Sequence, residues 1–422
     1  LDIQTPTPTN DVSVLDASNN VLPSQVFSAD SNTNTFRLLI QAKDIPSVGY
    51  KVLHVVPGKR RIKSDLKVSG MTMENAALRV SVDSRTGCMT SIYQKVSHLE
   101  ALAAGGCGNQ LQTFSDKPQG DDAWNIDPGT LDHFTPLMNT DSVVMIEKGP
   151  LRSVIRLTRT WSKSKIIQDI LLYAGSDELE VSTDIDWHET NILLKAAFPL
   201  ATRSKMATYE IPFGTIQRPT TRNNTWEQAK FEVPALQWAD LGDNRTGLSL
   251  INESKYGYDC EGNVLRLTLL RSPVEPDPNA DRGNRHFSYV LYPHAGDWKT
   301  ALTIRRGYDY NNSLTAMQVQ PHEGRMPLKH SFINLQASNV VMTAVKKAEG
   351  VNGLIIHFYE WQGKDANVRI RVPPGAQSAI LTNLMEKPQG TGLSVTASGE
   401  ITVPIHPFEI MSIRIRYPNH QN

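Results

Sequence analysis

Three long runs of alternating apolar and polar residues follow one another with only short turns between them. They span residues 151–161, 165–173 and 179–187. In the last run, Leu179 and Val181 share one side with later apolar residues while the intervening residues are polar. This is the period of two of a strand with one buried face. Because parallel strands would need helices between them, the succession predicts a large antiparallel β-sandwich.

Shorter runs with the same pattern continue toward both ends of the chain. We predict a mainly β chain with a small β domain over residues 1–67, the large sandwich over 68–325, and an immunoglobulin-like β-sandwich over 326–422. Only two helical segments are expected. One covers residues 96–104, before two glycines, and the other is a short helix or turn that begins after Gly296.

The charge balance excludes several kinds of partner. Lys plus Arg and Asp plus Glu number 43 each, which gives a formal net charge of zero. A neutral chain lacks the basic field that attracts nucleic acid or an anionic membrane surface. No apolar stretch approaches the roughly 18 residues of a transmembrane helix. We therefore expect a soluble chain, with no nucleic acid and no membrane as partner and a neutral ligand.

The three cysteines, Cys88, Cys107 and Cys260, are sparse and odd in number. Disulfide frameworks belong mainly to small secreted domains, whereas a chain of 422 residues can bury a substantial core. The pattern favours free thiols over a disulfide framework, and it leaves one bridge plus one free thiol open.

A long polar segment joins two strand-like runs at residues 264–270 and 287–292. It carries several charged side chains, and three prolines hold it in an extended form. Polar loops that are fixed in this way suit sugar recognition, although many such loops are simple surface connections. The candidate ligand contacts in the segment are Arg271, Asp277, Asp281 and His286.

Several motifs occur in order along the chain. They are YEIPFGTIQRPT at 209–220, RNNTWEQAKFEVPALQWADL at 222–241, LLRSP at 269–273, PDPNAD at 276–281 and HFSYVLYPH at 286–294. Together they resemble the C-terminal part of class II α-mannosidases, glycoside hydrolase family 38, and most closely the cytosolic and vacuolar branch. The resemblance begins near Met71. It implies that the large sandwich is a galactose-mutarotase-like supersandwich that forms one wall of a sugar pocket.

The resemblance also implies roles for individual residues. By motif position, Tyr209 and Arg271 would reach a bound mannose, where a phenol and a guanidinium can donate hydrogen bonds to hydroxyl groups. Trp124 and Asp127 lie in a segment similar to the family's DAW-D motif, and Arg218 lies in a polar and aromatic loop. The structural alternative is that Tyr209 is an ordinary sheet residue and that Arg271 pairs with Asp277 or Asp281.

The catalytic parts of the resembled enzymes are not recognisable in this sequence. A retaining glycosidase needs two carboxyl groups roughly 5 Å apart, and the family adds a zinc ion held by His and Asp. None of the eleven histidines begins an H-x-D pair. We therefore expect no cofactor in this chain, zinc in a missing N-terminal catalytic domain, and no hydrolysis by the chain alone.

The expected partners are that N-terminal domain and a mannose-containing oligosaccharide. Homo-oligomers are allowed, and a cytoplasmic or vacuolar location is favoured over secretion.

Two other functions remain open at this point. One is a stand-alone carbohydrate-binding or structural β module. The other is an epimerase or polysaccharide lyase on a mutarotase-like sandwich, which needs a base with a partner acid. His286 with Asp281 is the one pair that would suit it.

Overall fold

The computed structural model describes residues 1–418, and it forms two compact units. One unit comprises residues 61–316, and the other combines residues 1–60 with the chain from Met317 on. The three-domain division with boundaries near residues 67 and 325 stays a prediction. The prediction of a mainly β chain built from antiparallel sheets is confirmed in both units.

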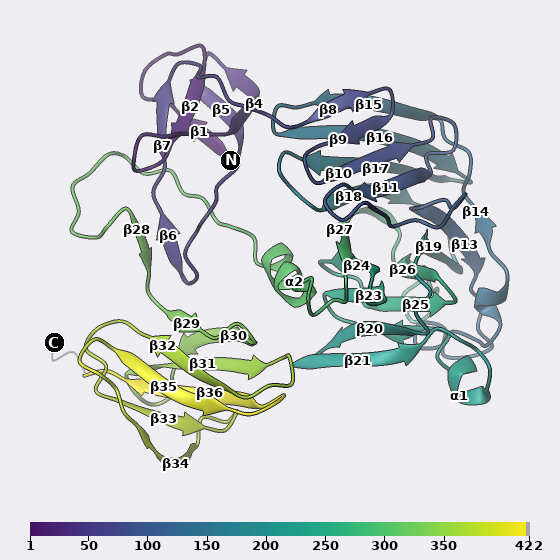
Figure 1. The fold of residues 1–422 in the computed structure, drawn as a ribbon. Coiled ribbons are helices and arrows are strands. Elements are labelled where there is room, and N and C mark those ends of the chain that lie inside the picture. Colours follow the sequence, from purple (N-terminus) through teal and green to yellow (C-terminus); the bar gives the residue numbers. More distant parts are fainter. Residues whose placement is uncertain (419–422) are drawn as a thin grey trace. The chain divides into compact units, whose positions relative to one another are not determined.

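The unit of residues 61–316 contains a nine-stranded antiparallel sheet (Figure 1). The three long alternating runs form neighbouring strands in it, with Arg152 opposite Tyr173 and Leu179 opposite Leu172. The strand order is β15 (Ser142–Lys148), β16 (Arg152–Trp161), β17 (Ser164–Tyr173), β18 (Leu179–Trp187), β27 (Gly283–Ala295), β24 (Thr246–Asn252), β23 (Trp238–Gly242), β20 (Met206–Ile211) and β21 (Gly214–Pro219).

Two further sheets belong to the same unit. The six-stranded sheet has the order β14 (Thr135–Pro136), β13 (Gln110–Ser115), β19 (Ile192–Pro199), β26 (Val264–Leu270), β25 (Gly257–Glu261) and β22 (Val233–Pro234). The five-stranded sheet has the order β12 (Leu99–Glu100), β11 (Met89–Gln94), β10 (Leu78–Val82), β9 (Thr72–Glu74) and β8 (Lys67–Ser69).

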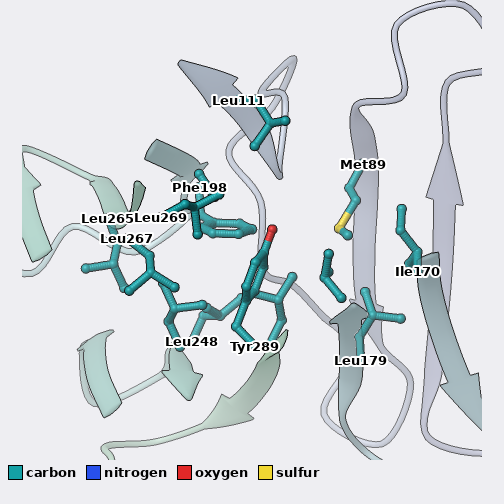
Figure 2. Packing of buried hydrophobic residues seen from close by; sticks show 14 of the residues in the cluster. Met89, Leu111, Ile170, Leu179, Phe198, Leu248, Leu265, Leu267, Leu269 and Tyr289 are labelled. Carbon is teal, nitrogen blue, oxygen red and sulfur yellow. The ribbon is translucent and has the colours of Figure 1, made fainter. Parts of the chain in front are cut away.

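One hydrophobic core joins the three sheets of this unit. Met89 of β11, Phe198 of β19 and Tyr289 of β27 are all fully buried in it (Figure 2). Each comes from a different sheet. Burial of these side chains away from water holds the sheets face to face, which is the arrangement of a β-sandwich.

Helices are few and short in residues 1–418. They are η1 (Thr130–Asp132), α1 (Thr225–Gln228) and α2 (Thr303–Asn311). The helix expected after Gly296 corresponds to α2. None of the described helices is long and apolar enough to cross a membrane.

The predicted helix over residues 96–104 is wrong. Leu99 and Glu100 form β12, which pairs with β11. The Glu100 carboxylate accepts hydrogen bonds from the backbone N–H groups of Ile92 and Leu102, at 2.8 and 3.1 Å. The Ile92 bond crosses from β11 to β12, whereas the Leu102 bond is local. Pairing with β11 therefore outweighs the local preference for a helix.

Cys88 and Cys107 form a disulfide, and Cys260 is free and buried. The interpretation that favoured free thiols is therefore wrong for two of the three cysteines, and the alternative of one bridge is the correct one. The residues that follow each cysteine, Met89 and Gly108, exchange two backbone hydrogen bonds of 2.9 Å. This pairing brings the two cysteine Cα atoms to 4.9 Å, and nothing in the local sequence indicates it.

The second unit contains several small sheets around two cores. Residues 1–60 contribute two three-stranded sheets. The first has the order β1 (Asp2–Gln4), β5 (Thr35–Ile40), β4 (Ser24–Asp30), and the second has the order β3 (Val21–Leu22), β2 (Val12–Leu15), β7 (His54–Pro57). A further strand, β6 (Gly49–Lys51), pairs with β28 (Lys329–Ser331). Val14 and Phe36 lie in the smaller core.

The larger core of this unit lies in a two-sheet sandwich near the C-terminus, where Ile356 and Ile413 are fully buried. The three-stranded sheet has the order β29 (Asn334–Gln336), β32 (Ala366–Arg371), β35 (Glu400–Ile405). The five-stranded sheet has the order β30 (Val340–Lys347), β31 (Gly353–Glu360), β36 (Ile410–Arg416), β33 (Ser378–Thr382), β34 (Pro388–Leu393).

A buried carboxyl group on β20 predicts a pH dependence of stability. Glu210 is 2% exposed, and burial raises its pKa from 4.5 to about 7. Because the pKa is raised in the folded state, the stability that the protonated Glu210 contributes is fully present below pH 4.5. This contribution is lost as the pH rises through about 7. Replacing Glu210 by glutamine is expected to raise the free energy of unfolding at pH 8 by up to about 3 kcal/mol and to change it little at pH 4.5.

Urea unfolding at the two pH values measures this difference. The Gln237 N–H donates to Glu210 at 2.8 Å, and the glutamine carbonyl can still accept that bond. Glu261→Gln, at an exposed carboxyl group on β25, is the matched control and should show no such gain. An equal pH dependence in the wild type and in Glu210→Gln would contradict the prediction.

Candidate functional site

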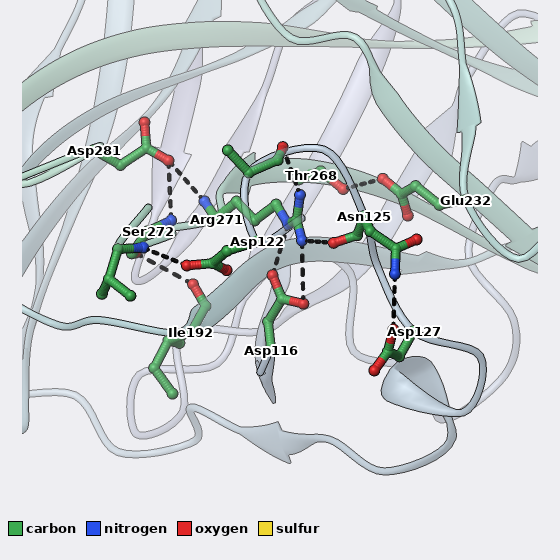
Figure 3. Close-up of polar contacts among 12 residues, drawn as sticks. Asp116, Asp122, Asn125, Asp127, Ile192, Glu232, Thr268, Arg271, Ser272 and Asp281 are labelled. Atoms are coloured by element: carbon green, nitrogen blue, oxygen red, sulfur yellow. Dashed lines mark hydrogen bonds and ion pairs between the residues drawn. The ribbon is translucent and has the colours of Figure 1, made fainter. Parts of the chain in front are cut away.

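Two loops of the first unit meet at Arg271. The first loop follows β13, and the second follows β26 and begins with Arg271 itself (Figure 3). Arg271 Nε donates to Asp116 Oδ2 at 2.6 Å, and the Asp116 side chain is almost completely buried. Burial raises the pKa of Asp116, and the Arg271 guanidinium opposes this effect. The ion pair therefore offsets part of the cost of burying the carboxylate, and it joins the two loops.

The remaining guanidinium nitrogens of Arg271 bind the backbone of the first loop. Nη1 donates to the carbonyl oxygen of Ala123 at 2.9 Å, and Nη2 donates to the carbonyl oxygen of Asn125. We refer to Arg271, Asp116 and these two carbonyl groups as the Arg271 cluster. The planar guanidinium group of Arg271 contacts three points of the first loop at once, which the single ammonium group of a lysine cannot do.

Two aspartates add hydrogen bonds between loop segments. Asp281 Oδ2 accepts from the backbone N–H of Arg271 at 2.9 Å and of Ser272 at 3.1 Å. Asp122 Oδ2 accepts from the backbone N–H of Val274 at 2.6 Å and from that of the next residue at 3.1 Å. Asp122 belongs to the first loop and Val274 to the second, so the loops are also joined outside the Arg271 cluster.

Trp124 and Asp127, predicted as sugar contacts, lie in the first loop beside this cluster. The Trp124 side chain is 75% exposed. Asp127 accepts hydrogen bonds from the backbone N–H of Gln119 at 3.0 Å and from Asn125 Nδ2 at 2.8 Å. The structure thus brings together three of the predicted site residues: Arg271, Trp124 and Asp127.

The alternative that Arg271 forms an ion pair with Asp277 or Asp281 is wrong, because its partner is Asp116. Asp281 binds the backbone of Arg271 instead of its side chain. Asp277 is exposed, and its carboxylate accepts from the backbone N–H of Asn279 at 2.9 Å. Both aspartates therefore shape the second loop.

His286 contacts Asp184 of the adjacent strand, not Asp281. Its Nδ1 lies 2.8 Å from Asp184 Oδ1, and both side chains are more than half exposed. They line a groove of about 440 Å³ on β17, β18 and β27. The pair that an epimerase or lyase would need from His286 and Asp281 is not formed.

Tyr209 and Arg218 contact each other on β20 and β21. Tyr209 is 1% exposed, and Arg218 lies over its ring with 4.7 Å between guanidinium carbon and ring centroid. Burial raises the pKa of the Tyr209 hydroxyl. Arg218 also donates to the Pro234 carbonyl at 3.0 Å. Within residues 1–418 no hydrogen bond or ion pair links this pair to Arg271, and both side chains remain predictions as substrate contacts.

A buried charge network that the sequence analysis did not single out lies on the six-stranded sheet. Lys195 is fully buried, and its ammonium group contacts Asp259 at 2.7 Å and Glu232. Arg266 donates to Asp259 at 2.6 Å, and Thr268 donates to Glu232 at 2.6 Å. The sequence did contain a signal for this network: Lys195 and Arg266 are single charged residues inside the apolar runs of β19 and β26. Because successive side chains of a strand point to opposite faces, these charges lie on the face away from the core.

The pKa values of this network follow from mutual compensation. Burial alone would lower the pKa of Lys195, but Asp259 and Glu232 raise it. Burial raises the pKa of Glu232, and Lys195 opposes this effect. Each charge depends on its neighbours, so the network is a structural element of the sheet.

Among residues 1–418, no group of three or more His, Cys, Asp or Glu side chains is placed to hold a metal ion.

Comparisons with known proteins identify the family. Residues 73–279 match the model of the glycosyl hydrolases family 38 C-terminal domain, and residues 339–413 match that of the family 38 C-terminal beta sandwich domain. Alpha-mannosidase 2C1 of Homo sapiens is 34% identical over 349 residues. The chain belongs to glycoside hydrolase family 38. This confirms the resemblance found in the sequence.

The similarity covers most of this chain but only part of the relatives. The match to the human protein covers 81% of this chain and 33% of that protein. Alpha-mannosidase G of Dictyostelium discoideum is 30% identical over 352 residues, which are 81% of this chain and 32% of that protein. The chain thus spans about a third of the length of these family 38 relatives.

A solved structure shares the fold of this family 38 chain. An alpha-mannosidase from Enterococcus faecalis V583 superposes with a TM-score of 0.79 at 16% identity. The match covers 97% of this chain and 51% of that one.

Proposed function

We propose that this chain is the C-terminal portion of a retaining, zinc-dependent α-mannosidase that hydrolyses terminal α-mannosides. The observation that carries the proposal is the 34% identity to an alpha-mannosidase over 81% of this chain. The matched region covers only 33% of that relative's length. The zinc site and the two catalytic carboxyl groups would belong to an N-terminal domain outside this sequence. No catalytic step is assigned to residues of this chain.

The role proposed for the chain is to supply one wall of the mannose pocket. The loops joined by the Arg271 cluster support this role, since they hold polar and aromatic side chains of the first unit in a fixed arrangement. Tyr209, Arg218, Asp277, Asp281 and His286 remain further candidates for substrate contacts. A cytoplasmic or vacuolar location and the capacity to form homo-oligomers belong to the same proposal.

The chain by itself is expected neither to hydrolyse an aryl α-mannoside nor to retain stoichiometric zinc. The longer protein, with its N-terminal domain, is expected to do both, because the ligands and the nucleophile would then be present. A chromogenic assay and elemental analysis of both proteins make the test. Chelator-sensitive turnover by the 422-residue chain alone would contradict the proposal, as would a longer protein that is folded, binds zinc and cleaves no α-mannoside.

A further inference from the structure

The backbone around Trp124 is fixed on both sides while its indole ring stays in solvent. The carbonyl groups of the residues before and after it, Ala123 and Asn125, both accept hydrogen bonds from Arg271. The backbone N–H of Trp124 donates to the carbonyl oxygen of Asp121 at 2.8 Å. The three bonds leave the loop little freedom to turn the ring inward.

The other tryptophans behave differently. Trp161 and Trp187 stack on each other with ring centroids 5.6 Å apart, and Trp238, Trp298 and Trp361 are buried. Among the tryptophans of residues 1–418, Trp226 is the other exposed one, at 80%, but it lies in the four-residue helix α1. Its carbonyl accepts a hydrogen bond from the Lys230 side chain, four residues further along the chain, at 2.9 Å. Trp226 is therefore a matched control: an exposed indole whose backbone is not tied to another loop.

The surroundings of Trp124 suit a neutral polyol. Asp121, whose carbonyl accepts the Trp124 backbone N–H, has an exposed side chain, and Asp127 has further lone pairs beyond those used by its two donors. Carboxylates accept hydrogen bonds from hydroxyl groups, and the face of an indole packs against the C–H groups of a pyranose ring. The same carboxylates repel an anionic ligand such as a sugar phosphate.

We propose that Trp124 is the stacking platform for a pyranose ring of an α-mannoside and that Arg271 is the residue that positions it. Arg271 acts through the carbonyl groups of Ala123 and Asn125, without contact to the sugar. The assignment of the ligand rests on the proposed function; the stacking surface itself rests on the exposed ring and its fixed backbone.

The test uses the 422-residue chain with ¹⁵N-labelled tryptophan and methyl α-D-mannopyranoside as the probe. The indole N–H resonances of Trp124 and Trp226 are assigned by their loss in Trp124→Phe and Trp226→Phe. The Trp124 resonance is expected to shift saturably with added sugar, while the Trp226 resonance stays in place. Trp124→Ala should weaken binding on the order of tenfold, measured on the sugar resonances, with an unchanged melting curve.

Arg271→Lys tests the positioning role. This variant is expected to move the Trp124 resonance of the free chain and to weaken sugar binding, with the Trp226 resonance again unchanged. A Trp124 resonance that does not respond to the sugar up to its solubility limit would overturn the platform, even if the longer protein is an active α-mannosidase. A saturable response beside an inactive longer protein would uphold the platform and count against the proposed function.

Discussion

Replacing Lys195 by methionine is expected to lower the free energy of unfolding by about 3 to 5 kcal/mol. The ammonium group of Lys195 is fully buried between Asp259 and Glu232. Methionine has a similar volume but no charge, so the core packing is retained and the carboxylates lose their shared cation. Asp259 keeps its ion pair with Arg266, whereas Glu232 keeps, among residues 1–418, the hydrogen bond from the Thr268 hydroxyl. The loss is therefore mainly the cost of a buried, uncompensated carboxylate.

Urea unfolding of the chain measures the loss, with Lys163→Met, at an exposed lysine in a turn, as the control. The control should stay within about 0.5 kcal/mol of the wild type. In Lys195→Met the pKa of Glu232 is raised in the folded state, so the deficit should shrink as the pH falls toward about 4.3, the value of an unfolded glutamate. Adding Glu232→Gln should recover part of the loss. A single variant as stable as the control would show that the network contributes nothing.

The fold of the first unit was predictable because its signal is local. Alternation along residues 151–187 sets which side chains face the core, and short turns between the runs require antiparallel neighbours. Strands β16, β17 and β18 follow directly from this pattern. The expected helix at residues 96–104 failed for a related reason. Leu99 and Glu100 are a two-residue strand whose partner, β11, decides the conformation, and so short a strand has no period of its own.

The candidate site was predictable only in part, because its contacts are distant in the sequence. Arg271 and Asp116 are separated by 155 residues, and nothing near Arg271 indicates a buried partner there. The nearby aspartates, Asp277 and Asp281, were the natural choice from the sequence, yet both bind backbone N–H groups of their own loop. The disulfide between Cys88 and Cys107 likewise depends on the pairing of β-structure and not on the spacing of the cysteines.

Replacing Arg271 by alanine is expected to lower the free energy of unfolding by about 3 to 5 kcal/mol. The family resemblance implied that the guanidinium reaches a bound mannose. In the structure the guanidinium binds Asp116 and two carbonyl groups of the chain itself. Its removal leaves the buried Asp116 carboxylate without a counterion. Urea unfolding of the chain measures the effect.

The matched control for Arg271 is Arg282→Ala, at an exposed arginine of the same loop. It should change the free energy of unfolding by no more than about 0.5 kcal/mol. Because the cost comes from a stranded charge, Asp116→Asn combined with Arg271→Ala should be more stable than Arg271→Ala alone, which a double-mutant cycle quantifies. If Arg271→Ala unfolds like the control, the ion pair does not hold the loops. A fall in kcat/KM of the longer enzyme would then favour direct contact between the guanidinium and mannose, since that loss could no longer come from a displaced Trp124 loop.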